Sequence, residues 1–166
     1  YAGDDLFGGF LDGPIANPED ANVYVTIGEG SSVYAGGDLV VLSSGDIDQA
    51  ELVLTNAGFV SIRETAVFAS GFNRVEVTNT GTLVQTATPA DDQQALIENL
   101  ASGPASITNH GLMQSSRDNS IIDAFLSSAG VNVVNTGTMS TAGGLAFDLS
   151  SGSGQFFLDN SGTISG

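Results

Sequence analysis

Cysteine, lysine and tryptophan are absent from this chain of 166 residues, and histidine occurs once. The lack of cysteine excludes a disulfide framework and thiol chemistry. Three arginines are the only basic residues beside 19 Asp and Glu, so the net charge is −16. No basic patch can form to meet phosphates, which excludes nucleic acid as a partner. No run of 18 apolar residues occurs, so no membrane span is predicted.

A repeated tripeptide, Asn-x-Gly, organises what is present. Its asparagines are separated by 23, 30, 26 and 25 residues (79 − 56, 109 − 79, 135 − 109 and 160 − 135). An alternating apolar run precedes each copy and a short apolar or Thr-bearing run follows it. The five copies are Asn56 to Gly58, Asn79 to Gly81, Asn109 to Gly111, Asn135 to Gly137 and Asn160 to Gly162. Self-similarity at a period of 20 to 50 residues is typical of a solenoid.

The tripeptide predicts a corner between two strands. Glycine adopts left-handed backbone angles without steric cost, and asparagine tolerates them next best. A corner about every 26 residues lets the chain wind round, so that each strand pairs in parallel with its equivalent about 4.8 Å away. The prediction is an all-β, right-handed parallel β-helix of about five coils with three short strands each. Its asparagines would form one column, amide over amide.

Residues 1–22 do not fit the repeat, whereas residues 23–166 do. We therefore expect an irregular N-terminal segment, a cap or docking strand, followed by the solenoid. Gly28-Glu29-Gly30 is a degenerate first corner in this interpretation. The N-terminal segment resembles part of one calcium-binding repeat of the RTX type, which makes Asp4, Asp5 and Asp12 the metal candidates. Calcium is the one cofactor that this resemblance implies, and an irregular end segment without metal is the alternative.

One stretch carries helix signals. Residues 88–100 offer Thr88 as an N-cap, Pro89 in the first turn and a glycine stop. Alignment of the repeats instead places 95–97 over strands of the following coils. We expect a strand there, with a short helical bulge before it as the alternative.

The order of three motifs superficially resembles the polygalacturonase family. These are Asn79-Thr80-Gly81, Asp91-Asp92 and Asn109-His110-Gly111. Glycine replaces the first acid of that family, however, and lysine is missing altogether. His110 occupies the variable position of a corner and has no His or Cys partner for metal binding. We expect no enzymatic activity.

The unit apolar-x-apolar-x-Asn-x-Gly-Thr-apolar is similar to the repeats of bacterial autotransporter passengers and large haemagglutinin-like adhesins. The closest copies are 75–83, 131–139 and 157–164, and the resemblance covers roughly residues 50–166. It implies a right-handed parallel β-helix in a secreted or cell-surface bacterial protein that adheres, forms fibres or displays other modules. The expected function is a non-catalytic, extracellular structural or adhesive solenoid, either a fibre subunit or a segment of a large adhesin. A polysaccharide-binding or polysaccharide-cleaving β-helix is the alternative.

The ends of a solenoid present unpaired strand backbone. We therefore expect self-association or continuation through these ends, with surface glycans as the other class of partner. A head-to-tail contact that does not close on itself builds a filament.

Overall fold

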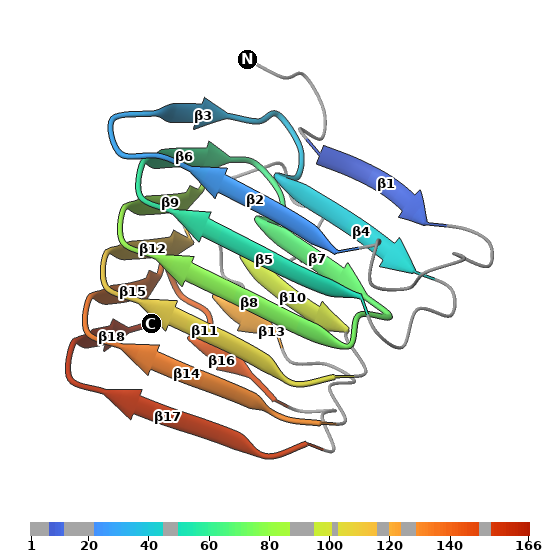
Figure 1. Ribbon diagram of the computed structural model, residues 1–166. Coiled ribbons are helices and arrows are strands. Elements are labelled where there is room, and N and C mark those ends of the chain that lie inside the picture. The colour runs from blue at the N-terminus through green and yellow to red at the C-terminus, as the bar shows by residue number, and fades with distance from the viewer. Residues whose placement is uncertain are drawn as a thin grey trace.

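The three-dimensional arrangement comes from a computed structural model (Figure 1). The structure describes residues 7–11, 22–44, 50–86, 95–100, 103–115, 120–123, 129–149 and 154–166. All regular elements among these residues are strands, and none is a helix. The described part therefore holds no helix that could cross a membrane.

The strands form three sheets of six strands each. The first sheet contains β2 (Val23–Ile27), β5 (Glu51–Asn56), β8 (Arg74–Asn79), β11 (Ala105–Asn109), β14 (Val131–Asn135) and β17 (Phe156–Asn160). The second contains β3 (Ser32–Tyr34), β6 (Phe59–Ile62), β9 (Thr82–Gln85), β12 (Leu112–Ser115), β15 (Thr138–Thr141) and β18 (Thr163–Ser165). The third contains β1 (Phe7–Leu11), β4 (Val40–Ser44), β7 (Val67–Ser70), β10 (Ile97–Leu100), β13 (Ile122–Asp123) and β16 (Phe147–Asp148).

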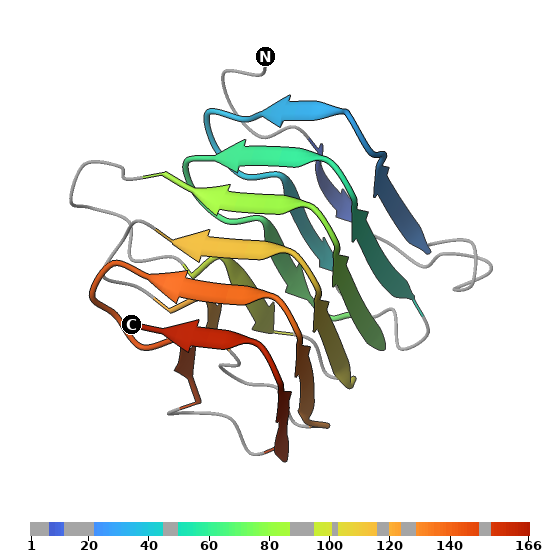
Figure 2. The same cartoon turned by 90° about the vertical axis from the view of Figure 1, so that its left-hand side faces the viewer.

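Within each sheet, consecutive strands pair in parallel and in register, and each pair joins equivalent strands of neighbouring coils. The chain runs from the first sheet to the second, then to the third, and returns to the first one level lower (Figures 1 and 2). Five successive groups of three strands, starting with β2–β4 and ending with β14–β16, make complete coils. The parallel β-helix predicted from the repeat is confirmed.

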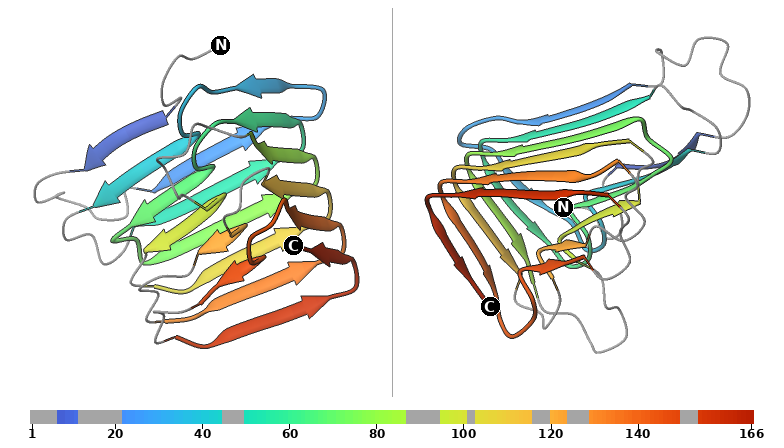
Figure 3. Two further views of the ribbon diagram at one scale, coloured as in Figure 1. Left: turned by 180° about the vertical axis from the view of Figure 1, so that it is seen from behind. Right: turned by 90° about the horizontal axis from the view of Figure 1, so that it is seen from below.

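The interior is built from in-register columns of apolar side chains. In the first sheet Leu54, Val77, Ile107 and Val133 pair in succession and are buried. Leu158 continues this column in β17 but is 45% exposed, because no described strand covers its far side. Alternation along each strand explains the pattern, since successive side chains point to opposite faces. The view along the axis shows the three sheets around this interior (Figure 3).

The segment with helix signals forms a strand where it is described. Ile97 pairs with Val67 on one side and with Ile122 on the other. Burial of Leu96 and Ile97 in the common core outweighs the local helix propensity. The helical bulge considered for the preceding residues lies outside the described residues.

The N-terminal segment contributes a strand to the third sheet. β1 pairs in parallel with β4, with Phe7 opposite Val40.

The first corner of the first sheet lies one residue away from the expected register, because Ile27 and not Gly28 pairs with Asn56. Residues 28–31 form this corner, whereas two residues suffice between β5 and β6.

Candidate functional site

The most distinctive polar feature is a column of five asparagines at the ends of the first-sheet strands. Asn56 Nδ2 donates to Asn79 Oδ1 at 2.8 Å, and Asn79 donates in the same way to Asn109 at 2.8 Å. The series continues from Asn109 to Asn135 at 2.8 Å and from Asn135 to Asn160 at 2.7 Å. The first four side chains are buried. We call this column the asparagine ladder.

Each of the first four amides in the ladder makes a second contact with the next coil. The Nδ2 group also donates to the carbonyl oxygen of the residue that opens the next second-sheet strand. These acceptors are Thr82 at 3.1 Å, Leu112 at 3.0 Å, Thr138 at 3.0 Å and Thr163 at 3.2 Å. A buried polar group costs little when it is fully hydrogen-bonded. The ladder therefore joins consecutive corners at little desolvation cost. Its hydrogen bonds form only when the coils stack in the observed register.

The two ends of the ladder differ from its middle. At the upper end Ile27 occupies the asparagine position, and the Asn56 Oδ1 atom accepts the Gly58 N–H at 3.1 Å instead. At the lower end Asn160 is exposed and has no described coil below it to accept from its Nδ2 atom. It keeps only the contact with the carbonyl oxygen of its own corner glycine, Gly162, at 3.4 Å, which the middle asparagines make as well. The repeating interaction is thus present at each of the four steps between asparagines and stops at both ends.

The corner glycines are required for a different reason from the one expected. A positive φ occurs at Gly30, Gly71 and Gly130 among the described glycines, and not at those of the Asn-x-Gly corners. A Cβ atom at Gly81 would lie 2.1 Å from the carbonyl oxygen of Gly58 in the coil above. The expectation of left-handed corner glycines is therefore wrong. Close approach of stacked backbones excludes a side chain there.

The same close approach recurs down the stack. A Cβ atom would lie 2.0 Å from the carbonyl oxygen of the preceding corner glycine at Gly111, and 2.1 Å from it at Gly137 and Gly162. At Gly58 the nearest carbonyl belongs to Ser31, at 2.6 Å. Each corner thus needs glycine because the corner above it is stacked directly on it.

The single histidine lies on the outside of a corner. His110 is exposed, and its Nδ1 atom lies 2.6 Å from the Thr136 hydroxyl. Within the part of the chain that the structure describes, no three His, Cys, Asp or Glu side chains are grouped to hold a metal. Asp4, Asp5 and Asp12, the calcium candidates, lie outside that part, as do Asp91 and Asp92.

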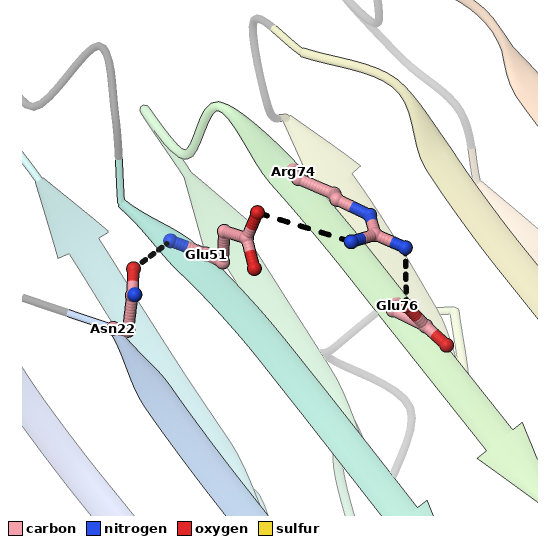
Figure 4. A network of polar contacts seen from close by, with 4 residues as sticks. All are labelled: Asn22, Glu51, Arg74 and Glu76. Carbon is pink, nitrogen blue, oxygen red and sulfur yellow. Dashed lines mark hydrogen bonds and ion pairs between the residues drawn. The ribbon is translucent and has the colours of Figure 1, made fainter. Parts of the chain in front are cut away.

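Arginine is used in one surface network of the first sheet. Arg74 lies 3.8 Å from a Glu51 carboxylate oxygen and 2.6 Å from one of Glu76 (Figure 4). The Glu51 N–H donates to Asn22 Oδ1 at 2.9 Å, which connects this network to the start of β2. All three ionic groups are partly exposed, and such pairs stabilise a fold by less than about 1 kcal/mol. The network links the neighbouring strands β5 and β8.

A row of carboxyl groups runs down the third sheet. Glu98, Asp123 and Asp148 pair in register on three neighbouring parallel strands. The pKa of Glu98 is raised from 4.5 to about 7, and burial is the largest cause. The hydrogen bond from the Ala95 N–H acts in the opposite direction, and the charges of Asp123 and Asp38 add to the rise in pKa. Sequence reasoning aligned these strands but missed their acids. The signal was an acid after each apolar pair, in Leu96-Ile97-Glu98, Ile121-Ile122-Asp123 and Ala146-Phe147-Asp148.

Exposed aromatic rings lie on the outer faces of the first and second sheets. Tyr34 and Phe59 lie with ring centroids 5.7 Å apart on the outer face of the second sheet. Tyr24 in β2 is 65% exposed and Phe157 in β17 is 58% exposed. Sequence reasoning did not single out these rings as surface features, although strand alternation assigns them outward positions.

Comparison with known proteins finds no matching family model, no matching curated protein and no matching solved structure.

Proposed function

We propose that this protein is a non-catalytic, extracellular structural and adhesive β-solenoid of a bacterial cell surface, either a fibre subunit or a segment of a large adhesin. The observation that carries the proposal is the continuous parallel stack held in register by the asparagine ladder. Such a stack presents long faces of regularly spaced side chains at nearly constant shape. The similarity of the repeat unit to autotransporter and haemagglutinin-like repeats supports the same function.

The chain has few of the side chains that commonly act as a catalytic base or nucleophile, and this scarcity supports the non-catalytic part of the proposal. The chain contains one histidine, no lysine and no cysteine. The imidazole of His110 lies exposed on an outer corner, where its Nδ1 atom contacts the Thr136 hydroxyl. Nucleophilic catalysis needs a base within hydrogen-bond reach of the nucleophile and a third group that orients the base.

A glycan-binding or glycan-cleaving β-helix is the second candidate, and the Tyr34–Phe59 pair is the observation that favours binding. The two rings are 50% and 37% exposed on one face. Ser61 lies beside them, since it pairs in register with Tyr34. Apolar ring faces with adjacent hydroxyl groups suit the mixed polar and apolar surface of a sugar ring.

The test combines a glycan array with an assay for released reducing ends on acidic polysaccharides. We expect saturable binding of the labelled chain to surface glycans and no release of reducing ends. Tyr34→Ala should weaken binding if the ring pair is the contact, whereas Thr163→Ala, on the outer face of the same sheet at its far end, should not. Polysaccharide turnover that disappears in Asp91→Asn or Asp92→Asn would replace the adhesive function with an enzymatic one.

A further inference from the structure

The two ends of the described stack are complementary in topology. Each sheet has six strands, so β1, β2 and β3 form one end and β16, β17 and β18 form the other. Among the described residues, no strand pairs with the outer edges of these six strands. Unpaired edges of this kind are templates for another strand.

The strand order also matches across the two ends. After β18, in the second sheet, the winding of the solenoid calls next for a strand in the third sheet, then one in the first and one in the second. β1, β2 and β3 lie in these sheets in this order. A second copy placed below the first would therefore continue all three sheets without a missing strand. Its β1, β2 and β3 would act as the next coil.

Exposed aromatic side chains from the two ends would meet at this junction. Tyr24 and Phe157 belong to one outward column, because the registers connect them through Val53, Glu76, Ser106 and Asn132. Continuing this register would place Phe157 of one copy beside Tyr24 of the next. These are the most exposed aromatic side chains among the described residues, at 58% and 65%. Cross-strand aromatic pairs stabilise neighbouring strands.

The interior columns continue in the same way. Leu158, which is 45% exposed at one end, would pack against Val25 at the other. In the second sheet, half-buried Ile164 would meet half-buried Val33. The contact is thus continuous with the coil-to-coil packing that the structure already repeats.

The net charge of −16 repels one copy from another, but the registers bring no two described acids together at the junction. Asp159 would pair with Thr26, and Asp148 would pair in register with Gly8. No described acid at one end faces an acid at the other. The asparagine ladder does not cross this junction, because Ile27 would lie opposite Asn160. Apolar packing and the aromatic pair therefore carry the contact.

We propose that a second copy of this chain stacks head to tail on the first, with Phe157 of one copy beside Tyr24 of the next and Leu158 packed on Val25. This inference rests on the proposed function, of which it specifies the fibre-subunit form. The contact is heterologous, so repetition gives an open filament unless the rotation closes a ring.

Sedimentation velocity over a range of concentrations tests the contact in the intact chain. The unmodified protein should form multimers, and Phe157→Asp should lower the apparent association constant about tenfold or more, since buried aromatic anchors dominate interfaces. Asn132→Asp is the matched control, because it adds the same charge in the same outward column one strand inside the end, where no second copy would pair with it. A monomer at all concentrations, or equal effects of the two substitutions, would overturn the proposal.

Disulfide trapping tests the register independently of affinity. The chain has no cysteine, so Tyr24→Cys and Phe157→Cys each introduce a single thiol. Parallel neighbours lie about 4.8 Å apart, within the Cα separation that a disulfide accepts. Mild oxidation of a mixture of the two variants should give a disulfide-linked dimer of Tyr24→Cys with Phe157→Cys. Its yield should exceed several-fold the yield of the corresponding dimer from a mixture of Tyr24→Cys and Asn132→Cys. Equal yields would contradict the proposed register.

The outcomes also separate this inference from the proposed function. A chain that binds glycans or cells as a monomer retains the adhesive function and excludes the junction. A chain that forms filaments through Phe157 and Tyr24 but binds no surface retains the junction and loses the adhesive role.

Discussion

The side-chain amide of Asn79 donates to the Oδ1 atom of Asn109 at 2.8 Å, across 30 residues of sequence. The same amide donates to the carbonyl oxygen of Leu112 at 3.0 Å, where the next strand of that coil begins. One side chain thus joins the corner of its own coil to the corner below. Repeated down the stack, this arrangement fixes the register of two sheets at once.

Replacing Asn109 with valine should lower the free energy of unfolding by about 1–3 kcal/mol, because Asn79 would lose its amide acceptor inside the fold. Denaturant unfolding measures this change. His110→Ala, at the adjacent exposed position, is the control and should change stability by less than about 0.5 kcal/mol. If the histidine substitution unfolds the protein, the assignment of this corner is wrong.

Gly111→Ala should be destabilising although alanine is a small residue. Its Cβ atom would lie 2.0 Å from the Gly81 carbonyl oxygen, and backbone cannot move aside as a flexible side chain does. We expect a loss of about 1–3 kcal/mol or more by thermal and denaturant unfolding. Gly28→Ala is the matched control, since its nearest contact is 3.9 Å away. Comparable losses in both variants would mean that stacking does not determine the need for glycine.

Ile107→Ala should cost about 2–5 kcal/mol, the usual cost of a cavity left by a large aliphatic side chain. Ile107 is fully buried between Val77 and Val133 in its column. Thr108→Ala, one residue further along the strand and on the outer face, should cost less than about 1 kcal/mol. Denaturant unfolding of the two variants distinguishes the faces of β11, and reversed magnitudes would assign the strand the opposite orientation.

Glu98 should make the fold more stable in mild acid. Its pKa in the folded protein is about 7, above the ordinary value of 4.5, so the folded state binds more protons than the unfolded state between these values. The contribution of this group to the free energy of unfolding is therefore fully present below about pH 4.5 and is lost as the pH rises towards 7. Glu98→Gln should reduce this pH dependence in unfolding experiments at several pH values.

Glu29→Gln is the control for that series, because Glu29 lies exposed in the first corner. It should retain the pH dependence of the unmodified chain. If Glu98→Gln leaves the slope between pH 4.5 and 7 unchanged as well, the protonation of Glu98 does not contribute to the pH dependence of stability.

The sequence predicted the fold because the corners and their apolar flanks repeat together. Asn56, Asn79 and Asn109 each end an alternating run, and this coincidence is enough to stack the coils. The reason for glycine was not predictable in the same way. Whether a corner needs a positive φ or merely lacks room for a Cβ atom depends on the distance to the coil above, which local sequence does not contain.

The surface features were harder to predict for a related reason. The carboxyl row of Glu98, Asp123 and Asp148 arises only when third-sheet strands are aligned residue by residue. Coil lengths vary, so an error of one residue moves a side chain to the other face. The first corner shows the same sensitivity. Gly28 was expected to pair with Asn56, but Ile27 does so, and the corner that follows has four residues where the next one has two.

The most direct test of this account is an NMR measurement of side-chain amide exchange and of contacts between asparagine amides. We predict slow exchange for the Nδ2 protons of Asn79, Asn109 and Asn135, with nuclear Overhauser contacts between successive members of the ladder. Exposed Asn132 supplies the fast-exchanging reference. Exchange of all three side chains at the rate of Asn132, without contacts between them, would contradict a parallel stack held in register by asparagines.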